Sequence, residues 1–256
     1  MNLVFAHGYL GWSQTSPLGI NYFRGLQAHI TRLGGHAALF PQVPPLGTYE
    51  DRARALADAI QQAYPEGPVH IIAHSMGGLD SRALIARNLH GLSNAGRIAS
   101  LTTLSTPHHG SPVADLLAGP RPHGPRRLLY DGVSRAIGLL GIDTGALANL
   151  TAEGSSKVPD VVQTHPHIRY RSYVGSGRVG LLRTCATLIP CHQYISAVTG
   201  QQNDGLVAQD SAQYGEVIEP FWRCDHFDMV GHNLDTADLV RQFDHLAAFD
   251  AIISRL

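Results

Sequence analysis

The sequence predicts an α/β fold with a mostly parallel six-stranded sheet and helices on both faces, in a single domain spanning residues 1–256. Short apolar runs alternate with segments of helical periodicity, which is typical of parallel strands joined by crossover helices. An α/β chain of this length commonly folds as one domain. We expect strands at Leu3–Ala6, Ala37–Phe40, Val69–Ala73, Ile98–Ser105, Ile168–Val174 and Val217–Pro220.

Four segments between and after these strands have a helical spacing of their apolar residues. In the last of them, Thr236 is placed to cap the N-terminus, while Leu239, Phe243 and Leu246 recur on one face. The expected helices are Ile20–Leu33, Tyr49–Ala63, Gly77–His90 and Thr236–Ile253.

An insertion interrupts this alternation between Pro107 and His167. A loop rich in proline and glycine at residues 119–125 precedes Arg126–Ile142, a segment with an apolar stripe at helical spacing. We therefore expect a helical lid or cap at about residues 111–160. The alternative is a helix packed permanently on the domain, because an amphipathic stripe is compatible with both. The stripe consists of Leu129, Val133, Ile137 and Leu140.

The composition restricts the class of protein and its partners. Hydrophobic residues make up 44% of the chain and charged residues 15%, which excludes a disordered chain and favours an apolar ligand. The net charge of -1, with arginines spread along the chain, predicts no nucleic-acid partner. The sequence has no run of the ~18 to 20 apolar residues that span a bilayer. No signal peptide is visible, so we expect a cytoplasmic protein or a leaderless or mature secreted form.

The segment from Val69 to Asp80 has the pattern of a nucleophile elbow, a sharp strand-to-helix turn that exposes a serine hydroxyl. A β-branched strand leads into Ser75. Ala73 and Gly77 stand two residues before and after it, where strand and helix pack too closely for larger side chains. The alternative is an ordinary glycine-rich connection, but the buried strand and the helical run that flank the serine favour the elbow.

A serine hydroxyl needs a base to take its proton and a carboxylate to orient that base. Among 15 histidines, His226 is singled out because it follows the last strand. Asp204 is the expected acid because it lies in a turn after the fifth strand and before the last one. The alternatives are His232 and His245 for the base, and Asp210, Asp225 and Asp228 for the acid.

Acyl transfer also needs two backbone N–H groups directed at the developing oxyanion. One is expected from Met76, directly after the serine. The second is expected from Tyr9, in the loop after the first strand, where Gly8 and Gly11 let the backbone approach closely.

Taken together and in order, these motifs resemble the bacterial true-lipase family, the Pseudomonas, Burkholderia and Proteus type of triacylglycerol lipase within the α/β-hydrolases. The resemblance implies Ser75 as nucleophile, Asp204 as acid and His226 as base, the N–H groups of Tyr9 and Met76 as the oxyanion hole, and a lid between Ser111 and Asp160. The residues that carry it are Phe5–Gly8 with Gly11, Tyr22–Gly25, Ala73–Asp80, Thr102–Ser111, Asn203–Val207, and His226 with Asp228.

Members of this family usually bind a structural Ca²⁺ through two aspartates. Asp228 stands where one is expected, but Val161–Asn203 contains no Asp or Glu that supplies the other. Because one carboxylate holds this cation poorly, we expect no metal and no cofactor, and we interpret Asp228 as a hydrogen-bond acceptor within its loop. A rearranged site with Asp225 and Asp235 is the alternative.

The family also often has a disulfide near the histidine loop. Cys224 has two candidate partners, Cys185 and Cys191, and the sequence does not choose between them.

These patterns and the resemblance predict a serine-dependent carboxylic ester hydrolase, of the lipase or esterase type. It would act through an acyl-enzyme on apolar acyl esters, synthetic polyesters among them, with transient contact to a lipid interface. The alternatives are an acyltransferase or thioesterase with the same three residues, and a catalytically silent lipid-binding module.

Overall fold

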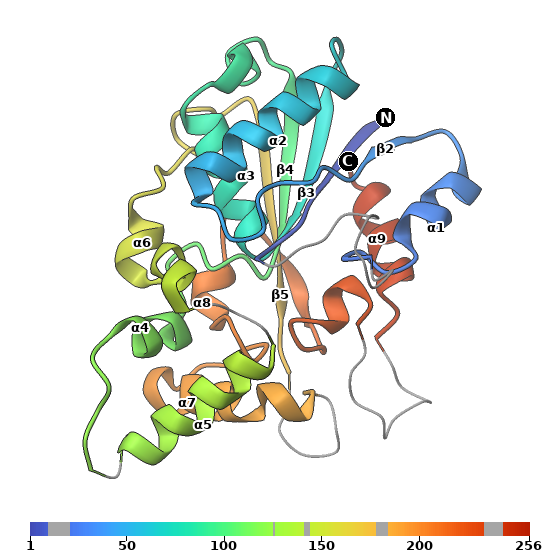
Figure 1. Ribbon diagram of the computed structural model, residues 1–256. Coiled ribbons are helices and arrows are strands. Elements are labelled where there is room, and N and C mark those ends of the chain that lie inside the picture. Colours follow the sequence, from blue (N-terminus) through green and yellow to red (C-terminus); the bar gives the residue numbers. More distant parts are fainter. Residues whose placement is uncertain (10–20, 125, 141–143, 178–183, 233–242) are drawn as a thin grey trace.

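The computed structural model describes residues 1–9, 21–124, 126–140, 144–177, 184–232 and 243–256. Within them, six strands form one sheet in which every pair of neighbours is parallel (Figure 1), which confirms the predicted fold class. The strands are β1 (Asn2–Ala6), β2 (Ala37–Leu39), β3 (Val69–His74), β4 (Ile98–Leu104), β5 (Arg169–Gly175) and β6 (Glu216–Trp222). Their order across the sheet is β2-β1-β3-β4-β5-β6.

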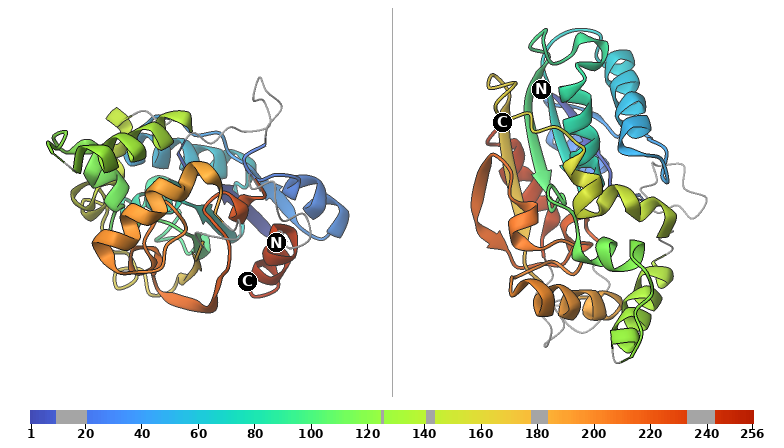
Figure 2. Two further views of the ribbon diagram at one scale, coloured as in Figure 1. Left: turned by 90° about the horizontal axis from the view of Figure 1, so that it is seen from below. Right: turned by 90° about the vertical axis from the view of Figure 1, so that its left-hand side faces the viewer.

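Helices pack on both faces of the sheet (Figure 2). One face is covered by α2 (Tyr49–Ala63) and α3 (Met76–Ala86), the other by α1 (Leu26–Leu33) and α9 (His245–Ile253). Strand β1 contributes side chains to the core on both faces of the sheet. Val4 packs toward α2 and α3, while the next residue, Phe5, packs toward α1 and α9. A parallel sheet covered in this way is buried on both sides, which explains why the central strands read as continuous apolar runs.

A third apolar cluster lies beyond the carboxyl ends of the strands. It joins α4 (Pro112–Ala118), α5 (Arg126–Leu139) and α7 (Ile189–Thr199). The predicted apolar stripe of α5 divides here: Val133 and Ile137 are buried in the cluster, whereas Leu129 is 40% exposed. The remaining helical segments are η1 (Leu89–Gly91), η2 (Thr144–Leu150), α6 (Ala152–Ser156), η3 (Ala186–Leu188), α8 (Gln209–Ala212) and η4 (Asp228–Val230).

The strand order creates a crevice between two connections. From β1 the chain goes outward to β2 and then returns to β3 on the other side of β1. The loops that follow β1 and β3 therefore start side by side and continue in opposite directions along the sheet edge. Ala6 and Ala73 are paired in the sheet, which brings the ends of these two strands level. The loop at His7–Tyr9 and the turn at Ser75 therefore lie next to each other at the carboxyl edge of the sheet.

The predicted helices differ from the observed ones mainly at their ends. Helix α1 begins only at Leu26, because Gly25 adopts a positive φ of 69°. Helix α3 ends at Ala86, before Asn88, whose φ is also positive. The predicted cap at Thr236 lies outside the described residues, and the described part of the last helix is capped by Asp244. None of the helices that the structure describes is long and apolar enough to cross a membrane.

Candidate active site

Ser75 occupies a strained turn between β3 and α3. Its φ of 55° and ψ of -130° are uncommon for a residue with a side chain, and such strain persists only where the surroundings enforce it. Two hydrogen bonds do so: the Ser75 N–H donates to the Leu104 carbonyl at 3.0 Å, and the Thr106 hydroxyl donates to the Ser75 carbonyl at 2.8 Å. The strand–turn–helix context of the predicted elbow is therefore present.

The glycines around this turn are required by close backbone packing. A Cβ at Gly77 would lie 2.9 Å from the carbonyl oxygen of His7, and a Cβ at Gly8 would lie 2.7 Å from the Cβ of Ser75. Real side chains do not approach this closely. The small residues of the two motifs thus let the β1 loop and the elbow pack directly against each other.

Asp204 and His226 are brought together from two loops. Asp204 follows β5, and His226 follows β6, which places both at the carboxyl edge of the sheet. The His226 Nδ1–H donates to Asp204 Oδ2 at 2.7 Å, and the His226 backbone N–H donates to the Asp204 carbonyl at 3.0 Å. Both side chains are almost fully buried. Asp204 therefore holds both the ring and the backbone of His226.

Asp204 is held in its ionised form. Burial raises the pKa of this carboxyl group, but the imidazole of His226 and the backbone N–H groups of Leu206 and Val207 more than offset that effect, so the pKa lies below its usual value. The two N–H groups donate to Oδ1 at 2.9 and 2.7 Å. Oδ2 remains directed at His226.

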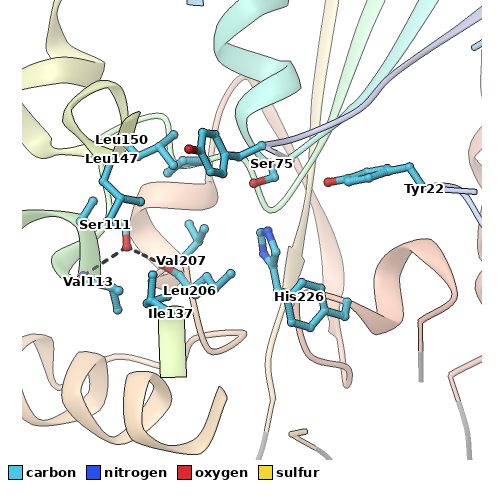
Figure 3. A pocket seen from close by; sticks show the side chains of 14 residues that line it. Tyr22, Ser75, Ser111, Val113, Ile137, Leu147, Leu150, Leu206, Val207 and His226 are labelled. Carbon is cyan, nitrogen blue, oxygen red and sulfur yellow. Dashed lines mark hydrogen bonds between the residues drawn. The ribbon is translucent and has the colours of Figure 1, made fainter. Parts of the chain in front are cut away.

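Ser75 and His226 line the same pocket. Figure 3 shows the serine hydroxyl and the histidine ring pointing toward one another, with Tyr22 on one side and aliphatic side chains on the other. The cavity measures about 80 Å³. Its aliphatic lining comes from α4, α5, η2 and the loop after Asp204, and it consists of Val113, Ala114, Ile137, Leu147, Leu150, Leu206 and Val207.

The two candidate oxyanion donors lie beside the serine. Met76 is the first residue of α3, and the N–H groups of a helix's first turn have no partner within the helix. Tyr9 lines the pocket together with Ser75. Both residues therefore lie next to Ser75, one along the chain and one across the pocket, and their role as oxyanion donors stays a prediction.

Arg52 holds the loop that carries Tyr9, a role that the sequence patterns did not reveal. This fully buried side chain of α2 donates to the carbonyl oxygens of His7 and Gly8 at 2.7 and 3.1 Å, and to Asp80 Oδ2 of α3 at 2.8 Å. It thereby connects the β1 loop to the helix that begins at the nucleophile. The available signal was an arginine on the apolar face of an amphipathic helix, between Tyr49 and Leu56.

His74 connects Tyr22 of the pocket wall to His226. A hydrogen bond of 2.6 Å joins the Tyr22 hydroxyl to Nδ1 of His74, and the rings of His74 and His226 pack with centroids 4.5 Å apart. Burial lowers the pKa of His74 well below its usual range, so this ring is neutral. A neutral ring packs against the base without the repulsion of a second positive charge.

The three cysteines are buried, and neither Cys185, Cys191 nor Cys224 takes part in a disulfide. Over the part of the chain that the structure describes, His, Cys, Asp and Glu residues do not gather into any group of three that could hold a metal ion.

The parallel sheet, the elbow and the Asp204–His226 pair define the class of protein. Residues 2–136 match the family described as alpha/beta hydrolase fold, and the chain belongs to this family. The finer resemblance to the Pseudomonas and Burkholderia type stays a prediction.

Two curated relatives are triacylglycerol lipases. One, from Vibrio cholerae, is 27% identical and is matched over 89% of this chain and 78% of its own length. The other, triacylglycerol lipase 2 of Saccharomyces cerevisiae, is 29% identical over 84% of this chain and 64% of its own length. The chain thus spans just under two thirds of the yeast protein.

Solved structures share the fold at lower identity. A mature Bacillus licheniformis lipase superposes with a TM-score of 0.69 at 22% identity, covering 91% of this chain and 87% of that one. A metagenomic carboxyl esterase gives a TM-score of 0.72 at 17% identity, over 100% of this chain and 75% of the other. Both comparisons support the predicted architecture.

Proposed function

We propose that this chain is a serine-dependent carboxylic ester hydrolase. The observation that carries the proposal is the hydrogen-bonded Asp204–His226 pair, which faces a serine on a strained elbow inside an apolar pocket. The triacylglycerol lipases and the carboxyl esterase among the similar proteins support ester hydrolysis.

In the first half of the proposed reaction, Ser75 Oγ attacks the ester carbonyl carbon while Nε2 of His226 accepts the hydroxyl proton. Asp204 stabilises the imidazolium that forms. The N–H groups of Tyr9 and Met76 donate to the oxyanion of the tetrahedral intermediate. When this intermediate collapses, the C–O bond to the alcohol breaks, the alcohol leaves with the proton from His226, and the acyl group stays on Ser75.

In the second half, His226 takes a proton from water, and the resulting nucleophile attacks the acyl-enzyme. The Ser75 Oγ–acyl bond breaks, the serine regains its proton and the carboxylic acid is released. No cofactor takes part in these steps. If an alcohol or amine attacks instead of water, the same residues perform acyl transfer, and if the acyl donor is a thioester they act as a thioesterase.

The pocket indicates the substrate class. Its aliphatic wall offers no charged partner among the residues that line it, which favours an acyl chain over a charged group. We propose apolar acyl esters as substrates, with polyesters among them.

Hydrolysis of p-nitrophenyl esters of graded chain length, from acetate to palmitate, tests this function. We expect release of p-nitrophenol and free acid in equal amounts, and the chain length with the highest kcat/KM identifies the acyl group that the pocket accepts best. Ester formation in place of acid release, in the presence of an added alcohol, would show an acyltransferase. Absence of turnover on the whole series would contradict the proposed function and favour the alternative of a catalytically silent lipid-binding module.

The helix α5 carries an exposed apolar row that fits the proposed contact with a lipid interface. Leu128 is 80% exposed and Leu139 is 74% exposed, while Ile137 on another side of the helix lines the pocket. We expect the double substitution Leu128→Ser with Leu139→Ser to reduce hydrolysis of emulsified tributyrin severalfold and to leave that of dissolved p-nitrophenyl butyrate unchanged. Rates on the two substrates, measured side by side, check this.

The pair Leu33→Ser with Leu46→Ser is the matched control, because these leucines are about half exposed and lie outside the pocket-lining elements. An equal loss on dissolved and emulsified substrate would instead identify α5 as a fixed structural helix, without an interfacial role.

A further inference from the structure

Asp225, the neighbour of the proposed base, uses both carboxylate oxygens to hold the histidine loop. The side chain is fully buried. Oδ1 accepts from the backbone N–H groups of Phe227 and Asp228 at 2.9 and 3.0 Å. Oδ2 accepts from the N–H of Cys185 at 2.7 Å. One oxygen thus shapes the turn that contains His226, and the other attaches that turn to a distant segment.

Asp228 closes the same turn from the other side. Its Oδ2 accepts from the Asp225 N–H at 3.0 Å, as expected for a hydrogen-bond acceptor within the loop. The bond from Asp228 to the Asp225 N–H closes the turn on itself, whereas the bond from Asp225 to Cys185 spans 40 residues of sequence. Asp225 therefore ties the loop to a segment outside it, in addition to the bond from the His226 N–H to the Asp204 carbonyl.

The segment that Asp225 reaches is the one that a calcium ion would tie to the histidine loop in the family that the sequence resembles. The residues present do not fit such an ion, because Val161–Asn203 has no carboxylate and the carboxylates of Asp225 and Asp228 are engaged with backbone N–H groups. A hard cation prefers six or more oxygen ligands, among them carboxylates from both sides.

We propose that Asp225 is a positioning residue, which anchors the loop of His226 to Cys185 by a direct hydrogen bond and makes a metal ion unnecessary there. This proposal rests on the proposed function, since His226 must be the base for its position to matter. An aspartate suits the task because its ionised carboxylate accepts hydrogen bonds on both oxygens. An asparagine has one acceptor oxygen and one donor nitrogen, so it keeps only one side of the link.

Two variants break this link from opposite ends. In Asp225→Asn, the amide oxygen still accepts within the turn, but the NH₂ group faces the N–H of Cys185. In Cys185→Pro, the donor is removed and the ring carbon that replaces its hydrogen displaces the Asp225 carboxylate, while the observed φ of -57° is one that proline adopts. Asp228→Asn and Cys185→Ala are the controls: the first retains an oxygen for the Asp225 N–H, and the second retains the Cys185 N–H.

We expect Asp225→Asn and Cys185→Pro each to lower kcat on p-nitrophenyl butyrate by on the order of tenfold to a hundredfold, with KM within about twofold of the wild type, because a displaced base slows chemistry more than binding. Combined, they should lower kcat no further than either one alone. The two controls are expected to remain within about threefold of the wild type. Excess EDTA, followed by millimolar CaCl₂, should change neither kcat nor Tm.

The proposal is overturned if Asp225→Asn keeps half or more of the wild-type kcat, if Asp228→Asn is as damaging as Asp225→Asn, or if EDTA lowers Tm and CaCl₂ restores it. Circular dichroism melts establish that each variant is folded at the assay temperature. If Asp225→Asn does not fold, the kcat of Cys185→Pro decides, and a value of half or more of the wild-type kcat overturns the proposal. A wild-type protein without esterase activity would contradict the proposed function instead.

Discussion

Replacing Ser75 with alanine is expected to lower kcat on p-nitrophenyl butyrate by on the order of 10⁶, because the acyl-enzyme cannot form without the hydroxyl. The methyl group of alanine fits the same turn, so the fold and the pocket should persist. The rate, measured with purified protein at saturating substrate, is compared with a thermal melt of the same sample, which should match the wild type closely.

Ser111→Ala is the matched control, because Ser111 lines the same pocket but its hydroxyl bonds to the Leu206 carbonyl and the Val113 N–H. We expect it to retain most of the activity while losing about 1 kcal/mol of stability through the lost helix cap. A Ser75→Ala protein with even a tenth of the wild-type rate would rule out Ser75 as the nucleophile.

Replacing His226 with alanine is expected to be about as damaging as the loss of Ser75, because no other group then takes the serine proton. The substitution also leaves the buried carboxylate of Asp204 without its main partner, so Tm should fall as well. Asp204→Asn should cost less, roughly 10³ to 10⁴ in kcat, since the imidazole keeps its place but not its tautomer. The three variants are measured with the same ester and buffer.

His245→Ala serves as the control, because its Nε2 bonds to the Arg24 carbonyl on the surface and takes no part in the pocket. If His245→Ala or His232→Ala abolished turnover while His226→Ala retained it, the base would have been misassigned.

Local sequence patterns predict the six strands and the elbow because these depend on neighbouring residues. The β-branched run at Val69–Ala73 and the small residues at Ala73 and Gly77 are visible without any knowledge of the rest of the fold. Helix ends were harder to predict, since Gly25 and Asn88 stop α1 and α3 at positive φ values that periodicity alone does not reveal.

The choice among the acidic residues cannot be made from their residue type and local sequence. Asp210 and Asp225 were equally plausible by residue type, but the structure places the first against Gln201 and the second against Cys185. Of the four candidate acids, only Asp204 is at hydrogen-bonding distance from the His226 ring in the part of the chain that the structure describes. Chain order after the strands predicted this choice, because the carboxyl ends of parallel strands meet at one edge of the sheet.

By itself, the sequence determined the sheet, the turn that carries Ser75 and the candidate partners Asp204 and His226, because apolar periodicity and glycine spacing act over a few residues. Only the tertiary structure decided what holds these groups in place: Arg52 on the His7 and Gly8 carbonyls, and Asp225 on the Cys185 N–H. Both contacts bridge 40 residues or more. Such contacts form when the packing of the whole chain brings their partners together, and neither partner's immediate neighbours in the sequence reveal them.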